Sequence, residues 1–424
     1  MTAYTQLSAE ALQKKYDECK KKYDQYVAKG LKLDMSRGKP GADQLALSNA
    51  LQNTLSPDDY IAEDGTDCRN YGGVDGIPEM KKIFADLMDV RLDEVFVGGN
   101  ASLTLMYESV ISFCLKDKGK RKFLCPSPGY DRHFAITEYL GVDMIPIPMT
   151  PDGPDMDAVR QHVTNPAVAG IWCVPVFSNP QGVVYSDEII KEMAALKPAA
   201  EDFRIFWDNA YIAHAFDGKP PKTANILREC EKQKAYDMPF VFTSFSKISF
   251  SGAGVCAMAA SPANLAKMRN HMIVQIIGPD KLNQLRHVRF FKDIEGIYSH
   301  MEKHAEILRH KFAVVLDALD AELKGKDIGS WLSPKGGYFV SFETLPGCAK
   351  RTVALCAEAG LVMTPAGATY PYGHDPQDSD IRIAPTFPSL EQLEQAMALF
   401  CVAVELAAVE KLLDPTVPYL QSNL

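Results

Sequence analysis

The sequence lacks the features that mark a nucleic-acid-binding protein, a membrane protein or a secreted protein. Its formal net charge is −9, from 45 lysines and arginines against 54 aspartates and glutamates. A protein that binds nucleic acid or an anionic membrane is expected to carry a basic stripe instead. No uninterrupted apolar run is long enough to cross a bilayer, and the first residues form neither a basic nor an apolar leader. We therefore expect a cytoplasmic protein with no nucleic-acid or membrane partner.

The sequence also lacks the cysteine pairs that bind metals or build disulfide frameworks. Its ten cysteines contain no C-x-x-C pair, and several lie in apolar runs, such as Cys173. Thiols in such runs are expected to be buried and reduced, as in proteins of a reducing compartment.

Two further patterns are decoys. His300 and His304 flank Glu302, but the order of residues differs from the H-E-x-x-H zinc motif. We expect no metal site, and we interpret these histidines, with Lys303 and His310, as a solvated helix face. The run 252–257 fits a dinucleotide fingerprint, but it precedes an apolar strand instead of opening a helix. A nicotinamide dehydrogenase would rest on that run alone.

The chain does contain short β-rich runs that alternate with helical or loop segments between about residues 94 and 260. These runs are 95–97, 123–125, 144–147, 170–174, 203–207, 240–243 and 255–259. Such alternation is typical of a mainly parallel sheet covered by helices. Because 424 residues exceed what one hydrophobic core usually organises, we also expect a second domain.

The C-terminal part has a different pattern, which predicts a smaller α+β domain. Residues 337–342 and 380–384 alternate as strands do, and residues 350–359 have the pattern of a helix. A capping box from Ser389 to Gln392 predicts a final helix that continues to about Leu413. The predicted fold class is therefore α/β, with a large domain at 45–300 and a small domain made of 1–44 and 301–424.

Polar residues stand directly after several of the predicted strands. Asp208 follows the run 203–207, Asn179 follows the run 170–174, and Lys247 follows the run 240–243. Residues 98–102 link the first strand to a predicted helix. If the sheet is parallel, these residues converge on one edge, where open α/β sheets bind ligands.

The chemistry of these residues fits one kind of cofactor. A lysine amine forms an imine with an aldehyde, and Phe245 and Phe250 would favour its reactive neutral form by desolvation. A carboxylate at a strand end keeps a pyridine nitrogen protonated, so that the ring withdraws electrons. A glycine-rich turn that opens a helix presents backbone N–H groups to a phosphate.

The ordered set of motifs resembles the class I/II aminotransferases of the aspartate aminotransferase fold. The matching elements, in chain order, are Asn179–Gly182, Asp208 with Tyr211, Ser244–Lys247 and Arg382. Ser36–Pro40, Asn70–Gly73 and Ile381–Pro388 are similar to the aspartate aminotransferase subgroup related to MocR-type aminotransferase domains. The resemblance covers roughly residues 30 to 410, and it implies a large cofactor-binding domain and a small domain, with the active site between them.

The resemblance implies that pyridoxal 5′-phosphate is bound to Lys247 as a Schiff base. Lys247, Asp208 and Tyr211 are then the catalytic residues: the lysine moves the substrate Cα proton, the aspartate pairs with the ring nitrogen, and the tyrosine hydrogen-bonds the phenolic oxygen. Asn179 shares this last role, and Tyr130 stacks on the ring. The residues implied to hold the phosphate are Asn100, Ala101, Ser102 and Ser244, with Tyr71 contributed by a second subunit of a homodimer.

On the substrate side, the resemblance implies that Arg382 binds the α-carboxylate as a bidentate fork. Arg37 is our candidate for a second carboxylate, and Gly38 and Asn179 complete the predicted substrate-binding set. Many members of the family carry an arginine a few residues after the lysine, which binds the phosphate. Residues 248–255 contain none, so Ser249 or Ser251 is expected to replace it.

The reaction implied is reversible transamination, most simply between aspartate and 2-oxoglutarate, which gives oxaloacetate and glutamate. Transamination of other amino acids, β-elimination and decarboxylation on the same cofactor stay open as alternatives. A regulator of the MocR type would need an N-terminal DNA-binding module, and about thirty residues with one predicted helix are too few for a helix-turn-helix.

Overall fold

The computed structural model describes residues 3–115 and 119–414, and it divides by internal contacts into two compact units. Unit 1 contains residues 1–41, 179–182 and 306–424, and unit 2 contains residues 42–178 and 183–305. The predicted division into domains at 45–300 against 1–44 and 301–424 stays a prediction. Residues 1–2 and 415–424 of the predicted small domain lie outside the described residues.

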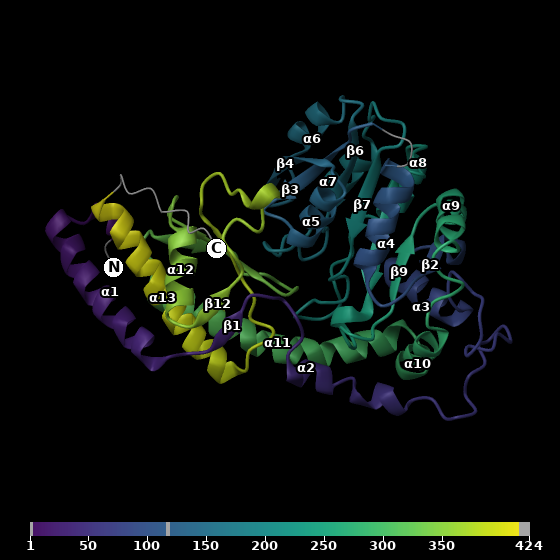
Figure 1. Ribbon diagram of the computed structural model, residues 1–424, viewed down its shortest axis with the longest axis horizontal. Coiled ribbons are helices and arrows are strands. Elements are labelled where there is room, and N and C mark those ends of the chain that lie inside the picture. Colours follow the sequence, from purple (N-terminus) through teal and green to yellow (C-terminus); the bar gives the residue numbers. More distant parts are fainter. Residues whose placement is uncertain (1–2, 116–118, 415–424) are drawn as a thin grey trace. The chain divides into compact units, whose positions relative to one another are not determined.

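Unit 2 is built on a mainly parallel sheet, which confirms the predicted fold class (Figure 1). Among the described residues the sheet has eight strands, in the order β2-β9-β8-β7-β6-β3-β4-β5. Their bounds are β2 Val95–Val97, β3 Lys122–Ser127, β4 Asp143–Thr150, β5 Gly153–Pro154, β6 Val168–Cys173, β7 Arg204–Asp208, β8 Pro239–Ser244 and β9 Cys256–Ala259. Each of the seven predicted β-rich runs overlaps one of these strands, and none extends more than one residue beyond it.

The strands in the middle of the sheet are largely apolar and buried because both faces of the sheet are covered. Alternate residues point to opposite faces. In β7, Ile205 and Trp207 join one buried cluster and Phe206 joins a second. A strand that is buried on both faces has a continuous apolar sequence without polar alternation, which is why short apolar runs were sufficient to locate the strands.

Helices supply the cover on each face of the sheet. Leu105 of α4 and Phe134 of α5 belong to one cluster, and Ile190 of α7 and Leu285 of α10 belong to the other. The helices of unit 2 are α2 Ala42–Ala46, α3 Pro78–Met88, α4 Ser102–Ser109, α5 Asp131–Tyr139, α6 Met156–His162, α7 Asp187–Ala194, α8 Ile226–Lys232, α9 Pro262–Met272 and α10 Lys281–Phe291, with short helical turns η2 Asn49–Asn53, η3 Leu92–Glu94, η4 Val110–Leu115 and η5 Phe245–Lys247. Helix α11 (Ile294–Leu323) contributes residues to both units.

The strand directions bring several chain segments to one edge of the sheet. Strands β6, β7 and β8 are parallel to one another. Strand β9 is antiparallel to both β8 and β2, so β2 runs in the same direction as β8. The segments that follow β2, β6, β7 and β8 therefore all leave the sheet from the same edge.

Unit 1 combines long helices with two small sheets. Helices α1 (Ala9–Lys29) and α13 (Leu390–Leu413) lie side by side (Figure 1). The predicted capping box is confirmed, because Ser389 Oγ accepts from the N–H of Gln392 and the Gln392 side chain accepts from the N–H of Ser389. The remaining elements are η1 Tyr4–Gln6, β1 Leu33–Met35, β10 Gly329–Trp331, β11 Val340–Thr344, α12 Ala349–Glu358, β12 Leu361–Met363, η6 Pro371–Gly373 and β13 Asp380–Ile383.

The cysteines and the apolar length of the helices were both considered in the sequence. All ten cysteines are buried and free, as predicted. Within the described residues, no helix has both the length and the apolar content that a membrane crossing requires.

The interpretation of His300 and His304 as a solvated face was wrong. His300 is 5% exposed and His304 is 0% exposed, and their Nε2 atoms lie 3.1 Å apart. Residues four apart share one face of a helix, and here that face is directed into unit 2, together with Ile297 and Met301. Lys303 and His310 are on the exposed side. The error arose because histidine was counted as a surface residue, whereas neutral histidine with hydrogen-bond partners is tolerated in a core.

Burial holds four histidines of unit 2 in the neutral form. Desolvation lowers the pKa of His287 and of His300 to about 4. Desolvation lowers the pKa of His214 to about 3, with a further contribution from the charge of Lys247, and desolvation lowers that of His304 to about 3. In the unfolded chain these groups titrate near 6.5, so their contribution to stability is complete above pH 6.5 and is lost as the pH falls towards about 4.

We predict that acid destabilises the protein through these histidines. At pH 5, each buried histidine should lower the free energy of unfolding by on the order of 2 kcal/mol relative to pH 7. Thermal unfolding midpoints measured between pH 7 and pH 5 should fall, and the variant His287→Gln should flatten that slope. His310→Gln is the control, because His310 is exposed, and it should keep the wild-type slope. Equal slopes for both variants and the wild type would contradict the assignment.

Candidate active site

The centre of the candidate site is a buried carboxylate at the end of β7. Asp208 is 3% exposed, and its Oδ2 lies 2.9 Å from Nε2 of His133. A carboxylate oxygen can only accept, so the histidine donates its Nε2–H. Burying a carboxylate requires such a partner, because desolvation of an isolated charge costs several kcal/mol.

His133 is itself held in place by its neighbours on α5 and β6. Its ring stacks on Trp172 at 4.4 Å between centroids and an angle of 9°, and the ring of Tyr130 meets it edge-on at 4.9 Å. Trp172 Nε1 donates to Thr137 Oγ1, which donates to the backbone oxygen of His133. These contacts fix both the place and the plane of the imidazole ring.

The second oxygen of Asp208 differs from the first in its hydrogen bonding. Asp208 Oδ1 is buried, and no hydrogen-bond donor reaches it from the described residues. A buried, unsatisfied carboxylate oxygen is costly, and it is the acceptor that a protonated ring nitrogen needs. The arrangement therefore fits a ligand with an N–H directed at Oδ1.

Lys247 lies at the end of the short turn η5, which follows β8. Its Nζ lies over the ring of Tyr211, 5.1 Å from the ring centroid. Tyr211 is buried and belongs to the segment after β7, so the structure brings the predicted lysine and the predicted tyrosine together. A cation over an aromatic face is attracted to its negative quadrupole.

The glycine-rich segment after β2 lies beside the Lys247 turn. Ser246 Oγ donates to the backbone oxygen of Asn100 at 3.0 Å, and Ser244 Oγ lies 3.2 Å from Ser246 Oγ. Ala101 is the N-cap of α4, and no side chain among the described residues caps this helix. The first N–H groups of α4, starting with Ser102, therefore remain as donors for an anion.

The two serines expected to replace the missing arginine already have partners. Ser249 Oγ lies 2.8 Å from His287 Nε2 and 3.2 Å from the backbone oxygen of Phe245, and it is fully buried. Ser251 Oγ donates to the backbone oxygen of Ser246 at 2.8 Å. Both hydroxyls act on the Lys247 turn, and their predicted role at a phosphate stays a prediction.

Tyr71 projects from the surface of unit 2. Its side chain is 81% exposed. The loop that carries it is held by Lys281, whose Nζ donates to the backbone oxygen of Gly72 at 2.8 Å. The backbone of Gly278 also approaches the backbone of Gly72 closely. The residue before it, Ile277, is an exposed apolar residue.

Unit 1 brings together Arg382, Asn179 and Gly38. Arg382 is 6% exposed, and its Nη1 donates to Asn179 Oδ1 at 3.2 Å. Its guanidinium lies over the ring of Phe339, 4.9 Å from the centroid. A methyl group at Gly38 would lie 2.3 Å from a carbon of the same ring, so glycine at this position lets Phe339 support the arginine. Arg37, in contrast, is exposed.

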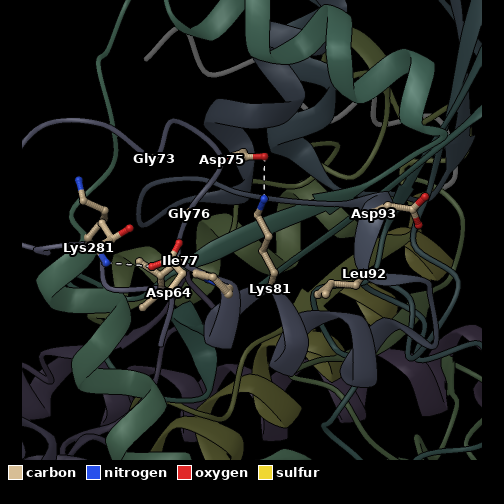
Figure 2. A pocket seen from close by; sticks show the side chains of 11 residues that line it. Asp64, Gly73, Asp75, Gly76, Ile77, Lys81, Leu92, Asp93 and Lys281 are labelled. Atoms are coloured by element: carbon tan, nitrogen blue, oxygen red, sulfur yellow. Dashed lines mark hydrogen bonds and ion pairs between the residues drawn. The ribbon is translucent and has the colours of Figure 1, made fainter. Parts of the chain in front are cut away.

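A separate hollow of unit 2 contains none of the predicted site residues (Figure 2). Its volume is about 640 Å³. Lys81 points to Asp75 at 2.7 Å, and Asp75 also pairs with Arg269 at 2.6 Å. The Asp75 carboxylate is therefore shared by two cations in an ion-pair network, and the hollow is not the candidate site.

Two residues of the site were missed in the sequence. His133 stands three residues after Tyr130, on the first turn of a helix, so it lies on the same face as that tyrosine. His214 stands three residues after Tyr211, and its Nε2 lies 3.3 Å from the backbone oxygen of Lys247. The i, i+3 spacing to a predicted site residue is the signal that would have selected both.

Comparisons with known proteins identify the family of the chain. The protein family described as aspartate amino-transferase matches residues 7–415. An aspartate aminotransferase of Corynebacterium glutamicum is 42% identical over 406 residues, covering 93% of this chain and 94% of the relative. A Mycolicibacterium smegmatis protein that carries an aminotransferase name is 44% identical over 425 residues, covering 97% of this chain and 99% of the relative.

Solved structures extend the comparison. The crystal structure of an aspartate transaminase from Corynebacterium glutamicum has a TM-score of 0.94 at 41% identity, covering 97% of this chain and 99% of that one. The α-aminoadipate aminotransferase LysN of Thermus thermophilus, complexed with N-(5′-phosphopyridoxyl)-L-leucine, has a TM-score of 0.73 at 20% identity, covering 92% of this chain and 95% of that one, and so shows the fold alone. The chain therefore belongs to the aspartate aminotransferase family and is a transaminase.

Proposed function

We propose that this transaminase uses pyridoxal 5′-phosphate to transfer the amino group of aspartate to 2-oxoglutarate, which gives oxaloacetate and glutamate. The observation that carries the cofactor is the buried, unpartnered Oδ1 of Asp208. The cofactor supplies an aldehyde that condenses with an amine and a ring that withdraws electrons from the substrate Cα. The name of the Corynebacterium relative supports aspartate as the amino donor, and the complex of LysN supports the cofactor.

Asp208 and His133 would hold the ring nitrogen. A carboxylate in a low-dielectric site keeps a neighbouring N–H protonated, because the opposite charge stabilises the charged form of the ring. His133, stacked on Trp172, orients the carboxylate through Oδ2, so that Oδ1 keeps a fixed direction. Tyr130, at the N-cap of α5, is proposed to lie against the ring.

Lys247 would hold the cofactor covalently and then move the proton at the substrate Cα. Tyr211 and Asn179 would hydrogen-bond the phenolic oxygen of the cofactor. The phosphate would lie at the N-terminus of α4, held by Asn100, Ala101, Ser102 and Ser244. The bond from Ser246 to Asn100 supports this assignment, because it fixes the helix entrance beside the Lys247 turn.

Arg382 would bind the substrate α-carboxylate through its planar fork. Its support by Phe339 and Asn179 keeps the guanidinium in one orientation, and orientation is what aligns the Cα–H bond for removal. Arg37 is proposed to bind the second carboxylate of a dicarboxylic substrate.

The proposal includes a homodimer in a cytoplasmic setting. Tyr71 would reach the phosphate of a second subunit, and its 81% exposure in the single chain supports this role. The ten free, buried cysteines support a reducing compartment.

The substrate assignment predicts a clear order among amino donors. With 2-oxoglutarate as acceptor, aspartate should give the highest kcat/KM of a panel that includes alanine, leucine, 2-aminoadipate and phenylalanine. The product formed from aspartate should be oxaloacetate, measured by reduction with a coupled dehydrogenase. A higher kcat/KM for a monocarboxylic donor, or release of pyruvate and ammonia from aspartate, would overturn the assignment.

Asp208→Asn tests the carboxylate. The variant preserves shape but removes the negative charge, so kcat should fall at least about 100-fold. Borohydride should still trap the cofactor on Lys247, as measured by the mass of the peptide. Asp202→Asn is the matched control, because Asp202 precedes the other end of the same strand and pairs with Arg121; its kcat should stay within about twofold of wild type. Near-normal turnover of Asp208→Asn would refute the role.

Arg382→Lys tests the α-carboxylate fork. Lysine keeps the charge but not the bidentate geometry, so KM should rise about 10- to 100-fold for every amino donor. Arg351→Lys, in an ion pair with Glu410 of the same unit, serves as the control with unchanged KM. If Arg382→Lys affects dicarboxylic donors alone, the arginine binds the side-chain carboxylate and the assignment must be changed.

A further inference from the structure

The turn that carries Lys247 is too short to satisfy its own backbone. Turn η5 contains Phe245, Ser246 and Lys247. The N–H groups of Ile248 and Ser249 both donate to one acceptor, the backbone oxygen of Phe245, at 3.0 Å and 2.8 Å. The last carbonyl groups of any helical turn lack a partner in the turn itself, so donors must come from elsewhere.

Side chains from three other places supply a donor to each of the next three carbonyl oxygens. Ser251 Oγ donates to the oxygen of Ser246 at 2.8 Å. His214 Nε2 lies 3.3 Å from the oxygen of Lys247, and His300 Nε2 lies 3.0 Å from the oxygen of Ile248. These three carbonyl groups are consecutive, and two of the three donors are buried histidines of unit 2.

His304 completes the arrangement around the oxygen of Ile248. Its Nε2 faces His300 Nε2 at 3.1 Å, and its Nδ1 lies 3.2 Å from Nε2 of the Gln44 side chain. Ser48 Oγ lies 3.2 Å from His300 Nε2. A carbonyl oxygen has no proton to give, so one histidine of the pair donates its Nε2–H to Ile248, and the side chains of α2 and its neighbouring turn fix the ring planes.

We infer that His214 and His300, the latter held by His304, are positioning residues for Lys247, because they hold the carbonyl groups of Lys247 and Ile248 and thereby fix the backbone from which the reactive side chain extends. This inference rests on the proposed function. His214 and His300 act as N–H donors without adding charge, because burial keeps all three histidines neutral, with the pKa of each lowered to about 3 or 4.

The backbone around Lys247 needs these hydrogen-bond donors because the turn that carries it is short. A reacting amine must be held near its target to a fraction of an ångström, and small displacements reduce the rate strongly. After Ile248 the chain enters the run Ser249–Gly254, which contains two glycines and belongs to no helix or strand. Side-chain donors from α11 and from the segment after β7 therefore supply the rigidity that a longer element would provide.

The experiment compares leucine and glutamine at His300 in the holoenzyme. Leucine keeps the approximate volume but removes the donor, whereas glutamine keeps an N–H. The readout is the visible circular dichroism of the bound cofactor divided by its absorbance, which reports how rigidly the cofactor is oriented, together with kcat and KM. His300→Leu should lower this ratio at least about twofold and kcat about tenfold with KM unchanged, and His300→Gln should recover most of both.

Two additional variants separate positioning from general stability. His287→Leu is the matched control, because His287 is also buried but contacts Ser249 Oγ and the backbone oxygen of Asn283 instead of the three carbonyl groups. It should lower the unfolding midpoint while the dichroism ratio and kcat stay within about twofold of wild type. Ser251→Ala removes the exposed donor with little loss of packing, and it should lower kcat about two- to threefold.

The outcomes are distinguishable. If wild-type protein does not bind the cofactor through Lys247, as measured by borohydride trapping and peptide mass, the proposed function fails. If trapping occurs but His300→Leu, or His214→Leu where the first variant does not fold, keeps the wild-type dichroism ratio and kcat, the positioning role is wrong. An equal loss in His287→Leu would also overturn it, because packing alone would then account for the effect.

Discussion

The structure of unit 2 depends on one electrostatic constraint, the burial of the Asp208 carboxylate. A charged carboxylate at 3% exposure is stable only with strong hydrogen-bond donors. The fold supplies one through His133, which is fixed in turn by Trp172 and Thr137. The other oxygen is buried and receives no hydrogen bond from the part of the chain that the structure describes. A ligand that donates a hydrogen bond to this oxygen would be attracted by the carboxylate charge, and its binding to the folded state would stabilise that state.

Much of this fold could be predicted from the sequence because burial on both sheet faces leaves a simple signature. The run 203–207 is apolar except for Arg204 at its start, and Asp208 follows it directly. The meeting of the site residues at one edge of the sheet could also be predicted, because strands that run in the same direction end at the same edge. Lys247 and Tyr211 were both predicted, and the structure brings them within 5.1 Å of one another, nitrogen to ring centroid.

What could not be predicted is how polar side chains far apart in sequence meet inside the core. His300 and His304 were taken for surface residues because an i, i+4 pair of polar residues is most often exposed. Their partners, Gln44 and Ser48, lie more than 250 positions away, and no local pattern identifies such a pairing. The antiparallel insertion of β9 between β2 and β8 is of the same kind, because the direction of a strand is set by the path of its connections.

The segment after Lys247 shows how a departure from the family pattern fits the rest of the unit. A side chain at Gly254 would lie 3.0 Å from the backbone nitrogen of Ser246, so the chain folds back closely on the turn at this point. The side-chain amide of Asn283 donates to the backbone oxygens of Ala253 and Gly254, each at 3.0 Å. The path of this segment is therefore fixed by α10, while the histidines of α11 and of the loop after β7 hold the turn itself. Where other family members place a charged arginine, this chain has backbone packed against backbone. The position of Lys247 thus depends on neutral hydrogen bonds from the core of unit 2.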